Sequence, residues 1–306
     1  MREISWEEYL EYLSKHREVV IEDTRIPLTG NKQVERFQPT EFETETTTVW
    51  SFPERGDWAT HQGNYRGNWA PQIPRNLILR YTQQGDWVLD PMVGSGTTLV
   101  ECRLLGRNGI GVDVNPQALM LTMDRLNFEP ANLYESLPPS TIRLYHGDAR
   151  NLELIEDCSI DLVATHPPYA GIITYTKGAP VEGDLSQLRS LDDFLNGITQ
   201  FAEECYRVLK PNKHCAILIG DTRRHKHYIP IAYRVMERFL QIGFILREDI
   251  IKVQWNMKST RERWSFGKER DFMLIYHEHL FVFRKPDIGE DIRKFKESMS
   301  NGACAQ

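Results

Sequence analysis

The chain has 306 residues, of which 41% are hydrophobic and 26% charged, as in an ordinary globular protein. This length fits one large α/β domain or two smaller ones. No run approaches the roughly 18 apolar residues of a membrane span, and the N-terminus lacks the apolar stretch of a signal peptide. We therefore expect a cytoplasmic protein with no membrane partner. The five cysteines are scattered, which favours reduced thiols over a zinc site.

The net charge of −6 is unevenly distributed. Between Arg207 and Arg270, 15 Lys and Arg stand against 6 Asp and Glu, so that this segment carries +9 and the remainder −15. Such asymmetry suits a protein with one anion-facing surface. A solvated basic face is the alternative explanation of a charge run.

Residues 1–45 are expected to form an N-terminal helix and a connection. Ser5 and Glu8 form a capping-box pattern before apolar residues on one helix face, and residues 22–39 are polar and aperiodic. Residues 46–52 are β-branched and aromatic, which indicates a strand. The stretch 56–74 is rich in Gly, Asn, Trp and Pro without any period. This composition favours a loop shaped around a ligand over a solvated linker.

From Trp87 onward, strands alternate with helices. Gly106 is placed to end a helix, and Asn115 followed by Pro116 is placed to begin the next. The alternation predicts an α/β fold, with a mostly parallel sheet of seven strands, helices on both faces and an antiparallel edge strand. The catalytic domain is expected at 46–287, with a charged tail at 288–306. The expected strands are 87–90, 109–113, 141–145, 160–164, 215–219, 244–252 and 272–283, and the expected helices include 75–81, 97–105, 190–209 and 229–241.

A glycine-rich loop, Asp90-Pro-Met-Val-Gly94-Ser-Gly96-Thr-Thr98, follows one strand and opens a helix. Glycines there let the backbone turn sharply and approach a ligand. No Lys follows Gly96, and the third glycine of the dinucleotide fingerprint is missing, so this is neither a Walker A loop nor that fingerprint. A carboxylate at the mouth of a pocket, as Asp90 would be, attracts a cation and repels a pyrophosphate.

Two further acids follow the next two strands. Asp113 comes where an acid accepts ribose hydroxyl hydrogen bonds, and Asp148 is placed to accept from an exocyclic amine. Alone, each acid reads as a helix cap or a loop residue. Three acids at successive strand ends fit a nucleoside that carries a positive group.

The strand at 160–164 ends in Thr165-His-Pro-Pro-Tyr169. Two prolines fix the backbone and remove two donors, so that the neighbouring carbonyls are rigidly aimed. A turn of this kind at the carboxyl end of an α/β sheet is a ligand position. A merely stiff loop is the alternative, because proline pairs also mark turns.

With these residues in view, the chain resembles the S-adenosylmethionine-dependent methyltransferases that modify exocyclic amino groups of DNA bases. These are the N4-cytosine and N6-adenine enzymes of restriction-modification type, with a Rossmann-like methyltransferase sheet. The glycine loop matches their glycine-rich motif, and His166 to Tyr169 is similar to their catalytic motif. Two positions depart from the family pattern. Met92 stands where Phe is common, and His166 stands where the family has Asp, Asn or Ser.

The resemblance implies S-adenosylmethionine as the cofactor and no metal. It implies a target base flipped out of the duplex, with the Pro167 carbonyl and a neutral His166 ring accepting the amine hydrogens and Tyr169 stacking on the base. His166 could also take the departing proton. The catalytic set is His166, Pro167, Pro168 and Tyr169. The cofactor set is Asp90, Pro91, Met92, Gly94, Ser95, Gly96, Thr97, Thr98, Asp113, Asp148 and Ala149, with Trp69 and Pro71 closing over the methionine end.

Within the catalytic domain, the basic segment 207–270 is expected to contact double-stranded DNA through phosphates and some base edges. A cognate restriction endonuclease acting separately is a candidate partner, and the sequence does not define an oligomeric state. The histidines at 277 and 279 read as a hairpin turn and not as metal ligands. The expected DNA contacts are Arg223, Arg224, Lys226, His227, Lys258, Arg261, Arg263 and Lys268.

Four functions fit these observations. The favoured one is methylation of cytosine N4, because His166 departs from the motif usual among adenine enzymes. Adenine-N6 methylation is the first alternative. Methylation of an RNA base and a catalytically inactive DNA-binding subunit are the others. An inactive subunit would have no need for Asp90, Asp113 and Asp148 together.

Overall fold

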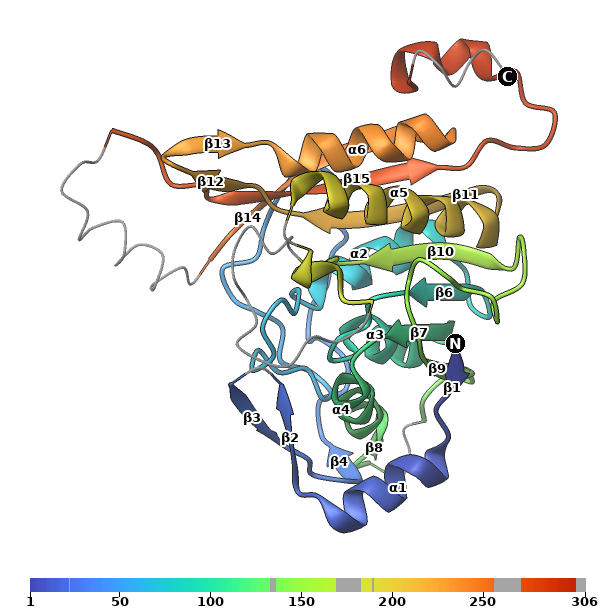
Figure 1. Cartoon of the computed structure of the whole chain (residues 1–306). Coiled ribbons are helices and arrows are strands. Elements are labelled where there is room, and N and C mark those ends of the chain that lie inside the picture. Colours follow the sequence, from blue (N-terminus) through green and yellow to red (C-terminus); the bar gives the residue numbers. More distant parts are fainter. Residues whose placement is uncertain (22, 133–135, 169–182, 189, 256–270, 301–306) are drawn as a thin grey trace.

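The computed structural model of the chain describes residues 1–21, 23–132, 136–168, 183–188, 190–255 and 271–300. A nine-stranded sheet runs through it in the order β1-β9-β7-β6-β10-β11-β15-β14-β5 (Figure 1). These strands are β1 (Arg2–Glu3), β5 (Val49–Ser51), β6 (Trp87–Asp90), β7 (Asn108–Asp113), β9 (Ile142–His146), β10 (Ile160–Thr165), β11 (Leu209–Ile219), β14 (Ile245–Val253) and β15 (His277–Arg284).

The centre of the sheet is parallel, from β9 through β7, β6 and β10 to β11. The next strand along the chain after β6 is β7 on one side, whereas β10 lies on the other, so the strand order reverses at β6. Ligands of open α/β sheets bind at such a switch point, beyond the carboxyl ends of the strands. The α/β class with a mostly parallel sheet is confirmed.

Two details of the sheet differ from the sequence prediction. It has nine strands where seven were expected, because the short strands β1 and β5 pair with β9 and β14. The antiparallel strand β15 is not at an edge but lies between β11 and β14, and it begins at His277, where a hairpin turn was expected. Such pairings join distant segments, which local sequence pattern does not specify.

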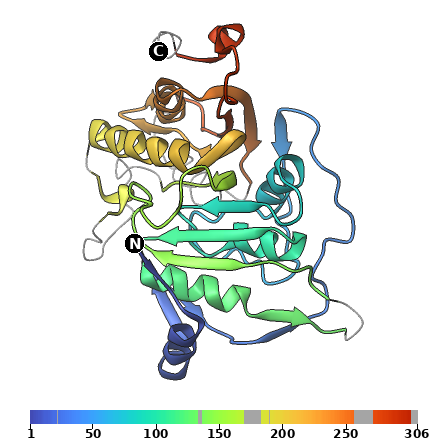
Figure 2. The same ribbon diagram turned by 90° about the vertical axis from the view of Figure 1, so that its right-hand side faces the viewer.

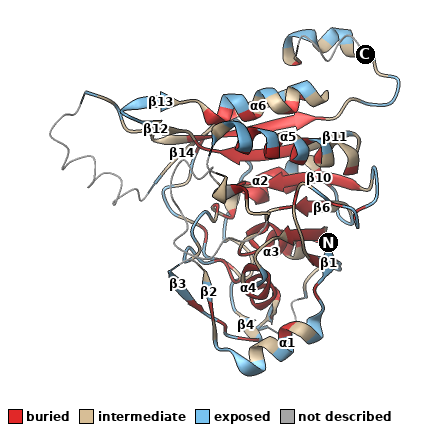
Figure 3. Cartoon of the chain, in the orientation of Figure 1, coloured by how far each residue is buried: buried red, intermediate tan, exposed pale blue. Residues whose placement is uncertain are grey.

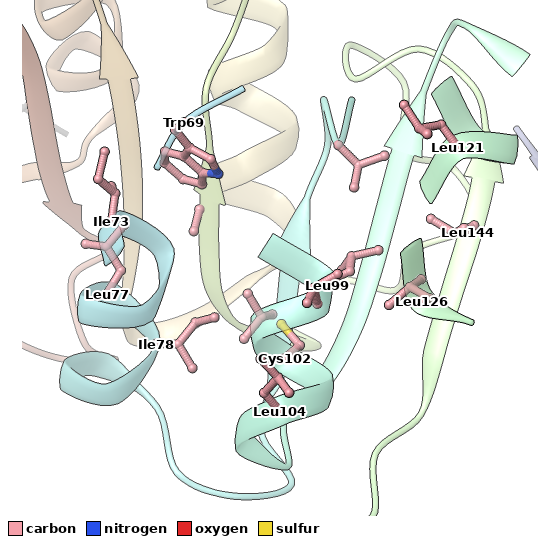
Figure 4. Packing of buried hydrophobic residues seen from close by; sticks show 14 of the residues in the cluster. Trp69, Ile73, Leu77, Ile78, Leu99, Cys102, Leu104, Leu121, Leu126 and Leu144 are labelled. Atoms are coloured by element: carbon pink, nitrogen blue, oxygen red, sulfur yellow. The ribbon is translucent and has the colours of Figure 1, made fainter. Parts of the chain in front are cut away.

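Helices cover both faces of the sheet. One apolar layer packs beneath α2 (Gln72–Tyr81), α3 (Thr97–Leu105) and α4 (Pro116–Leu126), and the other beneath α5 (Leu191–Val208) and α6 (Ile231–Ile242). Neighbouring residues of a strand enter opposite layers: Val88 joins the first and Leu89 the second. This is the period of two that a strand imposes. Figure 3 shows β10 and β15 buried along their length, and Figure 4 shows Ile73, Leu77 and Leu99 packed in the first layer.

Local signals for the helix ends are confirmed. The backbone N–H of Glu8 donates to Ser5 Oγ at 3.2 Å at the start of α1 (Trp6–Lys15). The Asn115 side chain accepts from Gln117 N at 2.9 Å before α4, and Gly106 ends α3 with φ of +68°. Glycine tolerates that left-handed backbone without a steric cost.

The expected connection at residues 22–39 is more structured than predicted. β2 (Glu18–Ile21) and β3 (Thr24–Pro27) form a hairpin, and β4 (Lys32–Val34) pairs in parallel with β8 (Phe128–Pro130). α1 lies at one end of the molecule, and the 3-10 helix η2 (Ile292–Ser298) lies at the other (Figures 1 and 2). The domain division at 45 and 287 stays a prediction. Among the described residues, no helix is both long and apolar enough to cross a membrane.

Candidate cofactor and catalytic site

A cavity of about 540 Å³ lies beyond the carboxyl ends of β6, β7, β9 and β10. The loops that follow these four strands form its walls, and segment 65–69 closes one side. Most of the predicted cofactor residues line it: Trp69, Asp90, Pro91, Met92, Gly94, Ser95, Thr97, Asp113, Asp148 and Ala149, together with His166, Pro167 and Pro168 of the predicted catalytic set. The structure therefore brings the two predicted sets into one cavity.

Three predicted cofactor residues do not line the cavity. Gly96 turns the loop into α3 with φ of +81°, and a Cβ there would lie 2.7 Å from Thr122 Cγ2. Thr98 is buried beneath the loop, and Pro71 precedes α2 as its N-cap residue. Their positions suit a role in shaping the wall more than direct contact with a ligand.

Asp113 ties the glycine loop to the end of β7. Its Oδ2 accepts from Gly94 N and its Oδ1 from Asn115 N, both at 2.8 Å. Gly94 has φ of +52°, and a Cβ there would lie 3.0 Å from the ring of Tyr65. Burial raises the pKa of the Asp113 carboxyl to about 6, although the two backbone donors oppose that rise. The carboxylate faces the cavity beside a loop that only glycine fits.

Asp90 joins the cofactor loop to the catalytic loop. Its Oδ2 accepts from Thr98 Oγ1 at 2.5 Å, and its Oδ1 accepts from Thr165 Oγ1 at 2.7 Å. Asp90 is 3% exposed, and burial raises its pKa to about 6, with both hydroxyls lowering it. Thr165 was not predicted as a site residue. The only signal in the sequence was a polar residue at the end of an apolar strand, directly before His166.

His166 lies at the inner wall of the cavity. Its ring stacks near Trp69, with centroids 6.2 Å apart, and its Nε2 lies 3.7 Å from Glu278 Oε1. Burial lowers the pKa of His166 below its ordinary value, and Glu278 opposes that change. The ring is therefore neutral at neutral pH. Pro167 and Pro168 line the cavity beside it, and Tyr169 is outside the described residues.

Asp148 forms an ion pair with Arg150. Arg150 Nε donates to both carboxylate oxygens at 3.0 Å, and Arg150 Nη2 donates to Oδ2 at 2.5 Å. The Arg150 hydrogen bonds use the same carboxylate oxygens that we expected to accept from an exocyclic amine. The role of Asp148 stays a prediction, and Arg150 is a residue that the sequence reasoning did not name.

Two segments of the wall were missed or named only in part. Val20, Ile21 and Asp23 of the β2–β3 hairpin line the cavity, although that region was read as a connection. The run Val19-Val20-Ile21 is the β-branched signal that could have identified the strand. Segment 56–74 was predicted as a ligand loop, and its Tyr65, Gly67 and Asn68 also line the cavity.

The predicted DNA residues divide into described and undescribed groups. Lys258, Arg261, Arg263 and Lys268 lie outside the described residues. The other four stand on a two-stranded ribbon, β12 (Thr222–Arg224) and β13 (His227–Ile229), which projects beyond the carboxyl ends of the sheet strands (Figure 1). His225 and Lys226 at its tip have φ of +49° and +67°. Consecutive left-handed residues form the tight turn that suits a two-residue hairpin.

Two of the ribbon cations are held by the protein itself. Arg223 donates to the carbonyls of Met273 and Lys226 and packs over the rings of Tyr228 and Phe272. Lys226 Nζ lies 3.2 Å from Asp271 Oδ1. Arg224 is exposed, and within the described part of the chain its side chain makes no hydrogen bond or ion pair. In those same ranges, no three His, Cys, Asp or Glu residues gather as they would around a metal ion.

Comparison with protein families gives a match over most of the chain. The DNA methylase profile matches residues 5–124 and 160–301. An RMKL-like methyltransferase domain profile matches residues 77–180. The first match covers both the glycine loop and the turn at His166.

Individual relatives match shorter segments. The Type II methyltransferase M.BglII of Bacillus subtilis is 30% identical over 131 residues, 41% of this chain and 33% of that protein. The tRNA (guanine(10)-N2)-dimethyltransferase of Methanothermobacter thermautotrophicus is 31% identical over 119 residues, 39% of this chain and 32% of that protein. Together with two further Type II methyltransferases, the matched segments span 10% to 33% of these relatives. Among solved structures, TrmN from Thermus thermophilus matches 72% of this chain and 50% of that chain, with 19% identity and a TM-score of 0.45.

Proposed function

Because this chain belongs to the DNA methylase family of amino-methyltransferases of restriction-modification type, we propose that it methylates the exocyclic amino group of a base in double-stranded DNA. S-adenosylmethionine is the cofactor of this family and supplies an activated methyl group on a positive sulfur. The observation that carries the proposal is the shared cavity. The glycine loop after β6 and the His-Pro-Pro turn after β10 line the same space, and Asp90 accepts hydrogen bonds from Thr98 of α3 and from Thr165, directly before the turn.

The residues of the cavity fit this cofactor. Asp113 stands at the end of the strand next to the glycine loop, where a carboxylate accepts from ribose hydroxyls. Asp90 and Asp113 supply negative charge for a ligand that carries a positive sulfur and a positive amino group. Gly94 leaves room for the Tyr65 ring and for a close approach of the backbone. Trp69 and Met92 add apolar surface to the same wall.

The acceptor side of the cavity suits an amine that is a poor nucleophile. The lone pair of an exocyclic amine is shared with its ring, so acceptors that hold the two N–H groups favour a pyramidal nitrogen and stabilise its developing charge. The Pro167 carbonyl is one such acceptor and the neutral His166 ring the other. His166 also has the chemistry to receive the proton that leaves the amine. A base reaches this turn only when it is flipped out of the duplex.

Cytosine N4 is the target that we favour, and adenine N6 is the alternative. The choice rests on His166, which replaces the Asp or Asn usual in adenine enzymes. Methylation of an RNA base is a second candidate, because the matched archaeal relative is named for a tRNA guanine. A catalytically inactive DNA-binding subunit is the remaining alternative.

One experiment separates these functions. The full chain is incubated with methyl-labelled S-adenosylmethionine and either duplex DNA of mixed sequence or total tRNA, and the nucleic acid is digested to nucleosides. Labelled N4-methylcytosine is the expected product. Labelled N6-methyladenine would show that adenine is the target base, and a label found only in RNA would show that RNA is the substrate. Cofactor binding without any product would indicate the inactive subunit.

A His166→Ala variant is the control for the role of the turn. We expect it to lose transfer by about 10²-fold or more, as when a general base is removed, while it binds the cofactor normally. Near-full activity in this variant would remove His166 from the proposed mechanism.

A further inference from the structure

A buried carboxylate from strand β15 lies close to the ring of His166. Glu278 Oε1 lies 3.7 Å from His166 Nε2, and the side chains of Glu278 and His166 are 5% and 11% exposed. The other oxygen, Oε2, accepts from Lys252 Nζ at 2.7 Å. The three residues, His166, Glu278 and Lys252, therefore form a row of ionisable groups that extends from the cavity wall to β14.

The sheet order creates this row. Lys252 of β14 stands directly opposite Glu278 of β15 in the antiparallel register. β15 lies between β14 and β11, and β11 pairs with β10, which ends just before His166. The insertion of β15 thus carries Glu278 toward the turn. Opposite charges on facing strand positions support each other, but a buried ion pair alone is weak support for a fold.

We propose that Glu278 is a positioning residue for His166, which holds the imidazole in place and stabilises the imidazolium formed when the target amine loses its proton. This inference rests on the proposed function. Lys252 Nζ holds Glu278 Oε2 in place with a hydrogen bond of 2.7 Å. A carboxylate behind the ring also explains how a histidine can work where relatives use Asp, Asn or Ser.

The proton balance of the step is complete with these groups. Methyl transfer forms the bond between the amine nitrogen and the methyl carbon, while the bond between that carbon and sulfur breaks with its electron pair on sulfur. The amine nitrogen is then positive, and one of its N–H bonds breaks with the pair left on nitrogen. His166 accepts that proton at a ring nitrogen and later releases it to water. Glu278 remains ionised throughout.

The charges that act on the ring come from different elements. Glu278 from β15 raises the pKa of His166, as does the backbone of Gly67, whereas burial and Lys252 from β14 lower it. Trp69, which flanks the ring, does not titrate. The two members of the ion pair therefore act on His166 in opposite directions.

Two variants test the proposal: Glu278→Gln and Lys252→Gln. The pKa of His166 is measured by NMR titration of its ring proton, assigned with His166→Ala, and the pH dependence of single-turnover methyl transfer is measured in parallel. We expect Glu278→Gln to lower this pKa and Lys252→Gln to raise it, with the acid limb of the rate moving the same way. Plateau transfer in Glu278→Gln should fall about tenfold or more, with unchanged affinity for S-adenosylmethionine.

A matched control removes another carboxylate from the same pair of strands. Asp249→Asn loses the partner of His279 Nδ1, which is 3.0 Å from Asp249 Oδ1, and should leave the titration of His166 unchanged. If both Gln variants move the pKa of His166 the same way, or neither moves it, the proposal is overturned. Should Glu278→Gln fail to fold, Lys252→Gln still tests the row, because it removes a positive charge that lowers the pKa of His166, and an unchanged pKa would overturn the proposal. The titration needs no substrate, so it also stands if no nucleic acid is methylated.

Discussion

At the residue scale, two carboxyls in the cavity, Asp90 and Asp113, are the groups that we propose attract the cofactor. Asp90 and Asp113 each have a pKa raised to about 6 by burial, and among the described residues neither accepts a hydrogen bond from a cationic side chain. A buried carboxylate without a cation is costly in its ionised form. A ligand that brings positive charge removes that cost. Two acids with raised pKa values, side by side in one cavity, suit a ligand that carries positive charge.

The affinity for S-adenosylmethionine should therefore depend on pH. Both acids are ionised well above pH 6 and become protonated as the pH falls through 6, so affinity should be constant from pH 7 to 8 and fall below pH 6. The decrease is about tenfold per pH unit for each proton that binding must release. Calorimetric titration between pH 5 and 8 measures it. S-adenosylhomocysteine lacks the charge on sulfur and should show a shallower decrease. Equal decreases for the two ligands would contradict a role for Asp90 in attracting that charge.

The sequence identified most residues of this wall but not their connections. Asp90 and Asp113 were found because acids at strand ends have a recognisable place in such folds. Thr165 and Glu278 were not found, because a threonine or a glutamate within a strand carries no signal of what lies across the sheet. Their roles depend on which strands become neighbours, and that is decided by long-range packing.

At the scale of elements, the β12–β13 ribbon has the shape of a nucleic-acid contact. A two-stranded ribbon fits the major groove of B-DNA. Arg223 is held against Tyr228 and Phe272, and it stiffens the ribbon from within. Asp221 accepts from the Tyr228 hydroxyl and from Ala232 N at the start of α6, which anchors the base of the ribbon. The side chain of Arg224 is exposed to solvent.

Arg224→Ala should weaken DNA binding without unfolding the protein. We expect a loss on the order of tenfold in affinity and, if the guanidinium contacts phosphate, a salt dependence shallower by about one charge. Arg223→Ala should instead lower the thermal midpoint, since it removes packing within the ribbon. Fluorescence anisotropy with duplex DNA at several salt concentrations gives the DNA affinity and its salt dependence, and thermal unfolding gives the midpoint. Lys15→Ala, which removes a positive charge from α1, is the control and should bind as the parent does. An unchanged slope and affinity in Arg224→Ala would remove the ribbon from the interface.

The elements themselves were predictable wherever their signals are local. Ser5, Asn115 and Gly106 mark helix ends by their own side chains or backbone freedom, and the structure has them there. The β2–β3 hairpin was missed because its strands are only four residues long, too short to show a period against polar neighbours. The position of β15 inside the sheet was missed for a different reason. Strand order is a property of the assembled sheet.

At the scale of the whole molecule, the N-terminal segment contacts α4 through a buried acid, Asp124, in addition to its strand pairs β1–β9 and β4–β8. Asp124 of α4 is 1% exposed in its side chain. Its Oδ1 accepts from the Tyr9 hydroxyl at 2.9 Å and from the backbone N–H groups of Thr29 and Gly30 at 3.0 and 2.8 Å. Lys32 Nζ lies 3.4 Å from its Oδ2. The same N-terminal segment provides Val20 and Ile21 to the cofactor cavity. Stability and cofactor binding are thereby coupled through α4.

Asp124→Ala should therefore affect both properties at once. Removing the acceptor leaves several buried donors unsatisfied, and we expect the free energy of unfolding to fall by about 3 kcal/mol or more. Tyr9→Phe removes a single donor and should cost about 1 kcal/mol. Urea unfolding followed by tryptophan fluorescence measures these differences. Affinity for S-adenosylmethionine should fall in Asp124→Ala and stay near normal in Tyr9→Phe, since only the first releases the segment that carries the β2–β3 hairpin. A strongly destabilised Asp124→Ala protein with unchanged cofactor affinity would show that the N-terminal segment supports the fold and not the site.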